Sequence, residues 1–364
     1  MVPSPDRHQT SYVEWLIFYG KVTGITILTA TIIAALNFIV NPMSLYPTHI
    51  FPPAIVNGRV NKIKLMKYAK PKPQALIIGA SNVFLIEPKD VTKSTGQVAM
   101  NASVESAMAE DYYAVIRFAV EQANLNLKTV FIGLDVGSFR NDISEDPRLL
   151  ETPELRSYIG VSDLYAEFKG LRLAFARSQT QLSVYTLEAA WKGRVKTPSA
   201  HLDPDGYVQY DQFHRDRMSG TFNLNANLRQ SVTLYSARYK GFSQLSRKRL
   251  RYLEQTLRYC REHGISAVLF TTPLHPYLRN MLPNYDPRLR ELRVQVENLS
   301  ATYNYPFFDY SNLDSFGGSS TYFYDGEHMD EGNARLLETK LFNDLKAYYF
   351  NTTARELIGV RGDK

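Results

Sequence analysis

The sequence predicts an α/β fold, in which a parallel β-sheet lies between two layers of helices, preceded by one membrane-spanning helix. Three observations support this expectation. Short apolar runs alternate with stretches of helical periodicity from residue 73 onward. Turn-forming residues follow the apolar runs, as they do at the ends of buried strands. Residues 22–40 form a long apolar run without a charged side chain. We therefore expect a three-layer α/β/α domain with right-handed crossovers after a membrane anchor.

The uncharged run at residues 22–40 (VTGITILTATIIAALNFIV) is predicted to be a transmembrane helix. At about 1.5 Å per residue, a helix of this length approaches the ~30 Å of bilayer hydrocarbon. Trp15, Tyr19 and Tyr46 flank the run, where interfacial aromatic side chains are common. No small-residue cleavage site follows it, which favours an uncleaved anchor over a cleaved signal peptide. A buried core helix is the other alternative.

Basic residues predict how the chain is oriented in a cell membrane. Arg7 and Lys21 precede the run and Arg59 is the first basic residue after it. This distribution favours a cytoplasmic N-terminus at residues 1–21 and an extracytoplasmic main domain. Residues 41–72 are expected to be a juxtamembrane linker. The linker ends in a basic run without an acidic residue, which consists of Arg59, Lys62, Lys64, Lys67, Lys70 and Lys72. We favour a solvated helix face for this run over contact with lipid headgroups.

Composition excludes several classes of protein. The chain has 364 residues and a net charge of +6 that is spread along its length, and it has no basic-aromatic motif, so we expect no nucleic-acid partner. Cys260 is the single cysteine, which excludes an intramolecular disulfide. His201, His214 and His263 are scattered without metal-ligand spacing, and no glycine-rich phosphate loop is present. We therefore expect neither a metal nor a cofactor.

The main domain is expected to span residues 73–349, followed by a tail at residues 350–364. Residues 143–242 interrupt its alternation of strands and helices. This segment is longer than an ordinary connection, so we interpret it as a mainly helical insertion that covers the site or determines specificity. Periodicity predicts strands at 75–78, 97–100, 129–135, 265–270 and 306–309, and helices at 105–122, 244–262, 287–303 and 333–349.

Three residues of this domain are of the types that form a nucleophilic catalytic site, namely a hydroxyl, a base and an acid. Ser81 follows the first strand, and Asp325 and His328 lie three positions apart on a polar loop before the last helix. A serine hydroxyl becomes a good nucleophile when a base removes its proton, and an acid orients that base. Ligands bind beside the carboxyl ends of the strands in an open α/β sheet, which is where Ser81 is expected. We therefore predict a Ser81–His328–Asp325 triad.

Each residue also has a structural interpretation. Ser81 could cap a short helix, and His328 could lie on the surface beside a turn at Asp325. Glu327 and Glu331 are further carboxylates that could orient the base. The catalytic interpretation is favoured because both segments follow strands of one predicted sheet.

This arrangement resembles the SGNH (GDSL-like) hydrolase superfamily. The similar features are the block Leu-Ile-Ile-Gly-Ala-Ser81, the strand that ends at Asp135, and Asp-Gly-Glu-His328 before the last helix. Together with the N-terminal span, they are most similar to membrane-anchored members associated with exopolysaccharide or cell-wall O-acylation. The resemblance covers residues 73–142 and 264–349, leaves the insertion unmatched, and implies a flavodoxin-like sheet.

The sequence departs from the superfamily where an oxyanion would bind. Ala80 replaces the acid of the usual Gly-Asp-Ser block, and the second block, Asn101-Ala-Ser103, has no glycine. Asp135 stands at the strand end where the third block has its asparagine. We therefore consider the Ser81 amide, Asn82 and Asn101 as oxyanion donors. Asp135 and His275 are candidates to line the site. A structural role is favoured for Asp135, whose carboxylate would repel an oxyanion, and a core or surface position is favoured for His275.

The resemblance implies ester chemistry on an acylated carbohydrate, through an acyl-serine that passes to water or to a sugar hydroxyl. The expected partners are this substrate, the lipid bilayer around the N-terminal helix, and a membrane protein of polysaccharide modification. The alternative is a catalytically silent binding or scaffold subunit of a polysaccharide export or modification complex, which the altered oxyanion blocks favour. A membrane enzyme that faces the cytoplasm is a further alternative.

Overall fold

The chain divides into two compact units. The computed structural model describes residues 7–43, 45, 46, 48, 50, 51, 58–192 and 200–359. One unit comprises Met1–Asn57 and Val161–Lys196, and the other comprises Gly58–Gly160 and Thr197–Lys364. Parts of the predicted N-terminus, linker, insertion and tail lie outside the described residues. They are residues 1–6, 44, 47, 49, 52–57, 193–199 and 360–364.

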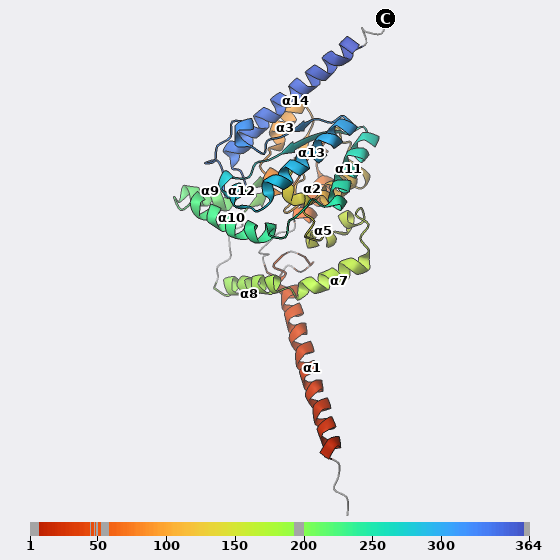
Figure 1. Ribbon diagram of the computed structural model, residues 1–364, viewed down its shortest axis with the longest axis vertical. Coiled ribbons are helices and arrows are strands. Elements are labelled where there is room, and N and C mark those ends of the chain that lie inside the picture. The colour runs from red at the N-terminus through yellow and green to blue at the C-terminus, as the bar shows by residue number, and fades with distance from the viewer. Residues whose placement is uncertain are drawn as a thin grey trace, which may run out of the picture. The chain divides into compact units, whose positions relative to one another are not determined.

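The first unit is built on a long apolar helix, α1 (Arg7–Val40). Its stretch Tyr12–Val40 is long and apolar enough to cross a membrane (Figure 1), and few of its residues are buried. The apolar stretch begins ten residues before the predicted start at Val22. Lys21 lies just before the uncharged run and does not interrupt the helix, because helical backbone hydrogen bonds do not depend on side-chain polarity.

Two further helices, α7 (Asp163–Ala174) and α8 (Arg177–Trp191), pack against the C-terminal end of α1. Asn37 is fully buried there. Its Nδ2 donates to the Ala174 carbonyl and to Thr180 Oγ1 (3.0 Å), and Ser183 Oγ donates to its Oδ1 (2.8 Å). The predicted insertion is therefore divided, and its central part belongs with the N-terminal helix.

The second unit contains a five-stranded parallel sheet in the order β2-β1-β3-β6-β7. This is the flavodoxin-like order 2-1-3-4-5, so the predicted fold class is confirmed. Strand register places Ile78 beside Ile132 and Leu134 beside Thr271, so the carboxyl ends of the central strands lie at one edge. The strands are β1 (Ala75–Ile78), β2 (Ala99–Asn101), β3 (Thr129–Leu134), β6 (Ser266–Thr271) and β7 (Phe307–Phe308).

Helices cover both faces of this sheet (Figure 1). Alternate strand residues, Ile77, Phe131 and Phe270 among them, form a core with Leu337 and Leu341 of the last helix. That helix was predicted to end at 349, but it continues to Gly359, so most of the predicted tail is helical. The principal helices are α3 (Pro88–Thr95), α4 (Ala109–Glu121), α11 (Arg247–Glu262), α13 (Tyr285–Tyr303) and α14 (Glu331–Gly359).

Shorter elements connect these layers. Three 3₁₀ turns follow strands, namely η1 (Ser81–Val83), η2 (Val136–Phe139) and η3 (Leu313–Ser315). The parts of the predicted insertion in this unit form α5 (Pro147–Leu150), α6 (Pro153–Arg156), a hairpin of β4 (His201–Leu202) and β5 (Val208–Gln209), α9 (Asp211–Met218) and α10 (Leu224–Tyr239). Helix α12 (Pro276–Met281) follows β6.

The basic run before β1 is not a uniformly solvated face, because Arg59 and Lys62 are buried. They belong to α2 (Gly58–Tyr68), which packs on this unit. Arg59 forms a bidentate pair with Asp111, with Nε–Oδ1 and Nη2–Oδ2 distances of 2.7 and 2.9 Å. Lys62 Nζ donates to the carbonyls of Asn101 (2.7 Å) and Gly206. Buried charges need such partners, so the expectation of solvation was wrong for these two residues.

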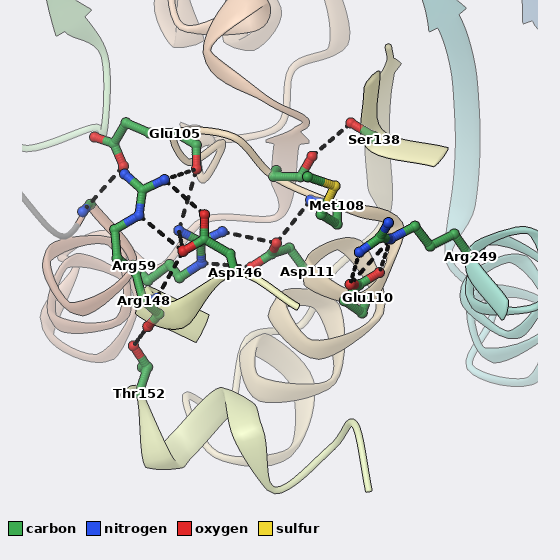
Figure 2. Close-up of polar contacts among 12 residues, drawn as sticks. Arg59, Glu105, Met108, Glu110, Asp111, Ser138, Asp146, Arg148, Thr152 and Arg249 are labelled. Carbon is green, nitrogen blue, oxygen red and sulfur yellow. Dashed lines mark hydrogen bonds and ion pairs between the residues drawn. The ribbon is translucent and has the colours of Figure 1, made fainter. Parts of the chain in front are cut away.

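Figure 2 shows the ionic network around Arg59, which joins several segments of the second unit. Arg148 pairs with Asp146 (2.8 Å) and donates to the Glu105 carbonyl (3.3 Å), to which Arg59 also donates. These contacts join α2 and α5 to the loop that precedes α4. The segment expected to be a linker is therefore partly an integral helix of the α/β unit.

Candidate active site

Two glycines allow the turn that carries Ser81 to approach β3 closely. A Cβ at Gly79 would lie 2.7 Å from the Gly133 carbonyl oxygen, and a Cβ at Gly133 would overlap Val83 Cγ1. Real side chains do not pack at such distances, so only glycine fits at either position. Ser81 begins η1 at the carboxyl end of β1, beside the point where the strand order reverses. This is where ligands bind in open α/β sheets.

Asn101 fixes the backbone that follows Ser81. Its Nδ2 donates to the carbonyls of Val83 (2.9 Å), Ile86 (3.1 Å) and Phe84 (3.3 Å). Its Oδ1 accepts from Ser103, and the side chain is completely buried. The amide has no remaining donor for an oxyanion, which corrects the expectation from sequence. Asn101 instead holds the nucleophile turn in place.

The loop that carries His328 is folded around the Asp325 carboxylate. Asp325 Oδ1 accepts from the backbone amides of Glu327 and His328, each at 2.8 Å. Neighbouring elements hold the loop: Ser231 Oγ of α10 accepts from the Gly326 amide (3.0 Å), and the His275 amide donates to the Gly326 carbonyl (2.9 Å). The imidazole therefore stands on a loop that is fixed from two sides.

The structure brings the three predicted triad residues together. His328 Nε2 lies 2.9 Å from Ser81 Oγ. His328 Nδ1 lies 2.9 Å from Asp325 Oδ2 and 3.1 Å from Oδ1. These distances are normal for hydrogen bonds. The imidazole lies between the serine hydroxyl and the carboxylate, which is the arrangement in which it can accept the serine proton. Glu331, an alternative orienting acid, instead accepts from Tyr324 and lies 3.0 Å from His214.

Electrostatics favour the ionised forms of the His328–Asp325 pair. Burial alone would lower the pKa of His328, but the charge and hydrogen bond of Asp325, with the charge of Glu327, raise it to about 9. Burial opposes ionisation of Asp325, yet His328 and two backbone amides hold the pKa of this carboxyl below its usual range. The imidazolium that forms when a base accepts a proton is therefore stabilised here.

A second carboxylate, Glu327, lies on the other side of the imidazole. Its Oε2 is 3.7 Å from His328 Nε2, and Tyr235 of α10 donates a hydrogen bond to it. Burial, with the charge of Asp135, raises the pKa of Glu327 to about 7, although His328 opposes this. Burial also raises the pKa of Asp135 to about 6, against the effect of nearby backbone amides and Arg140. Asp135 therefore lies near the predicted triad and interacts with it through Glu327.

Asn82 and His275 have structural partners. Asn82 Nδ2 donates to Thr272 Oγ1, which joins η1 to the end of β6. Its Oδ1 is buried and has no hydrogen-bond partner among the described residues. His275 caps α12, its Nδ1 accepts from the Tyr277 amide (3.0 Å), and its ring lies against Phe323. Burial lowers the pKa of this imidazole.

An aromatic cluster contacts the imidazole through Tyr210, and the sequence did not predict it. The Tyr210 ring is 5.6 Å from the His328 ring, between centroids, and also contacts Phe84 beyond the nucleophile turn. The Tyr210 hydroxyl is buried and has no hydrogen-bond partner in the described part of the chain. The only signal in the sequence was the density of aromatic residues after Gly206. The other members are Tyr207, Phe213, Phe222 and Tyr324.

Comparisons with known proteins add little to this geometry. No protein-family model matches the chain, and no curated protein matches it. A crystal structure from Bacteroides fragilis, described as a "putative acylhydrolase", is similar over 80% of this chain and 94% of its own, with 12% identity and a TM-score of 0.36. So low a TM-score supports no argument about fold or activity, and the α/β assignment rests on the sheet itself.

Proposed function

We propose that the chain is a membrane-anchored serine esterase or O-acyltransferase of the SGNH type. The observation that supports this most is the continuous set of contacts from Ser81 Oγ through His328 to Asp325, at 2.9 Å for each step. The three residues come from two segments far apart in sequence, and the fold holds each segment by separate hydrogen bonds. A surface histidine or a simple helix cap would need no such alignment.

In the proposed reaction, His328 Nε2 removes the hydroxyl proton as Ser81 Oγ attacks the ester carbonyl. The bond from the carbonyl carbon to the leaving alcohol then breaks, and the imidazolium gives its proton to that alcohol. His328 next deprotonates water or a sugar hydroxyl, which attacks the acyl-serine. The bond from the acyl carbon to Ser81 Oγ then breaks, and the imidazolium returns its proton to Ser81 Oγ. Asp325 holds Nδ1–H and stabilises the imidazolium at both stages.

The oxyanion would be bound by backbone amides in this proposal. The Ser81 amide belongs to the first turn of η1, where helix geometry leaves N–H groups without internal acceptors. One oxyanion donor contributes about 3 kcal/mol to an acyl transfer, so a site without side-chain donors is expected to be slower than one with a complete set.

An acylated carbohydrate outside the cell membrane is the proposed substrate, with a polysaccharide-modification protein as a membrane partner. The resemblance in sequence supports the substrate class, and the apolar helix α1 supports membrane attachment. The distribution of Arg7, Lys21 and Arg59 supports an extracytoplasmic α/β unit. Hydrolase and transferase share the same residues and differ in which acceptor reaches the acyl-serine.

A silent binding or scaffold subunit is the second candidate. The structural use of Asn101 favours it, because backbone carbonyls take up the side-chain amide of one of the three oxyanion donors expected from sequence. Silent relatives of enzymes retain the fold while losing one step of the chemistry, and the oxyanion site is the incomplete part here.

A fluorophosphonate probe separates the two candidates in membranes that contain the full chain. We expect covalent labelling of the native protein and its loss in Ser81→Ala and His328→Ala. Labelling is expected to be kept in the control Ser219→Ala, which changes an exposed serine just after α9. Absence of labelling at every pH between neutrality and about 10, in a protein that is folded by circular dichroism, would exclude the enzyme and leave the scaffold.

A further inference from the structure

Helix α7 exposes large apolar side chains along one face. Leu164, Phe168 and Leu171 are 77%, 61% and 58% exposed, and Phe175, just after the helix, is 42% exposed. The spacing of these residues, four, three and four, places them on one side of a helix. Ala166, off this stripe, is buried. The helix therefore packs through other residues and leaves its most apolar stripe uncovered within the described part of the chain.

Helix α8 has a corresponding stripe. Val184 and Trp191 are 53% and 91% exposed, and Leu187 lies between them at helical spacing. They line an apolar hollow together with Phe51, Ala190 and Glu188. The polar residues Gln179, Ser183 and Thr186 are instead buried, and Ser183 bonds to Asn37 of α1. Apolar side chains of α8 are thus exposed and polar ones buried. This is the reverse of a surface helix in a soluble protein, whose apolar side faces the core.

The position of both helices on α1 identifies what covers these stripes. Helices α7 and α8 contact the C-terminal end of α1 and extend to either side of it (Figure 1). The apolar surface of α1 continues to this end, where Phe38 and Ile39 are 46% and 44% exposed. If α1 spans a bilayer, the surface of that bilayer would lie near the C-terminal end of α1, where α7 and α8 pack.

The composition of the two helices suits a bilayer interface. Trp191 and Tyr165 have the amphipathic rings that are enriched at the headgroup level. Arg172, Arg177 and Lys192 are exposed beside the apolar stripes, where their side chains can reach lipid phosphates. An interfacial helix combines such an apolar stripe with basic flanking residues.

We propose that α7 and α8 form an interfacial platform that lies in the surface of the bilayer around α1, with the stripes Leu164–Phe168–Leu171 and Val184–Leu187–Trp191 in contact with lipid. The ligand of this surface is the headgroup and upper acyl-chain region of the bilayer. The inference rests on the proposed membrane anchoring by α1, and it does not depend on the proposed chemistry at Ser81.

The two tryptophans of the chain allow a direct test in the full-length protein. Trp15→Phe leaves Trp191 as the only tryptophan, on α8, and Trp191→Phe leaves Trp15, on α1. Each variant is reconstituted at one copy per lipid nanodisc. The lipids are brominated either near the headgroup end of the acyl chain or near its terminal methyl, and aqueous iodide is the opposing quencher.

We expect the emission of Trp191 to shift to shorter wavelength in lipid, to be quenched most by the shallow bromine, and to be protected from iodide. Quenching by iodide without quenching by bromine would overturn the proposal. Protection from both quenchers would also overturn it, because a protein would then cover the stripe. Trp15 reports separately on α1: if bromine fails to quench Trp15 as well, the anchoring itself fails.

A second measurement addresses α7. Leu164→Cys and the control Val294→Cys, on exposed positions of α7 and α13, are each labelled with an environment-sensitive fluorophore. Cys260 is buried and is replaced by serine in both. We expect the label at 164 to respond as Trp191 does and the label at 294 to stay accessible to iodide. Equal accessibility of the two labels would exclude α7 from the platform.

Discussion

The sharpest prediction concerns Asp325→Asn, which removes one charge from the proposed triad and changes its shape little. An asparagine Oδ1 can still accept from the amides of Glu327 and His328, so the loop is expected to keep its fold. The amide can no longer stabilise an imidazolium at Nδ1. The rise in the pKa of His328 from 6.5 to about 9 corresponds to about 3 kcal/mol in favour of the protonated ring.

That energy sets the order of magnitude of the kinetic effect. Loss of about 3 kcal/mol in the transition state slows acylation of Ser81 about 100-fold, and a wrong tautomer increases the loss toward the ~10⁴-fold known for such substitutions. The assay is the second-order rate of fluorophosphonate labelling or of aryl-acetate hydrolysis, with Asp314→Asn in η3 as the matched control. A variant within tenfold of the native rate, at the pH optimum of each, would refute the role of Asp325.

The remaining predictions concern pH and stability. Because a base must be neutral and the pKa of His328 is raised to about 9, fluorophosphonate labelling is expected to increase with pH through that value. Glu327→Gln removes a charge that raises this pKa, so it is expected to move the midpoint of the pH profile to lower pH. An unchanged midpoint would exclude this coupling between Glu327 and His328. Arg59→Met leaves Asp111 buried without its bidentate partner and is expected to destabilise the second unit by about 3–5 kcal/mol in urea unfolding, with partial recovery in Arg59→Met/Asp111→Leu. No loss in the single variant would contradict the importance of this pair.

Local patterns were sufficient to predict the sheet and the meeting of Ser81, His328 and Asp325. The apolar runs at β1, β3 and β6 are short and end in turn formers, and parallel strands bring their carboxyl ends to one edge. Ser81 directly follows β1, whereas His328 lies on the long loop after the edge strand β7, with β3 and β6 between these two strands. Their meeting therefore depends on the path of that loop as well as on the order of the strands. The distance of 2.9 Å between Ser81 Oγ and His328 Nε2 is consistent with the order of elements predicted from the sequence.

Features that depend on particular long-range contacts could not be predicted. The association of α8 with α1 depends on Asn37, whose partners are about 140 residues away in sequence. Arg59 and Lys62 carry charges that normally indicate exposed side chains, yet both are buried. Their burial depends on partners that the sequence did not identify. Asn101 has the residue type of an oxyanion donor, but the three carbonyls near it determine its actual use.

The helix α2 has a practical consequence for anyone who prepares the α/β unit without its anchor. A soluble fragment trimmed at the apparent linker, to begin at residue 73, would lack the guanidinium that faces Asp111 and the ammonium that binds the Asn101 carbonyl. Asn101 in turn holds the backbone after Ser81. The fragment should begin before Gly58, because in a shorter one the turn that carries Ser81 would lose this support, and a loss of the proposed activity would be mistaken for a requirement for the apolar helix.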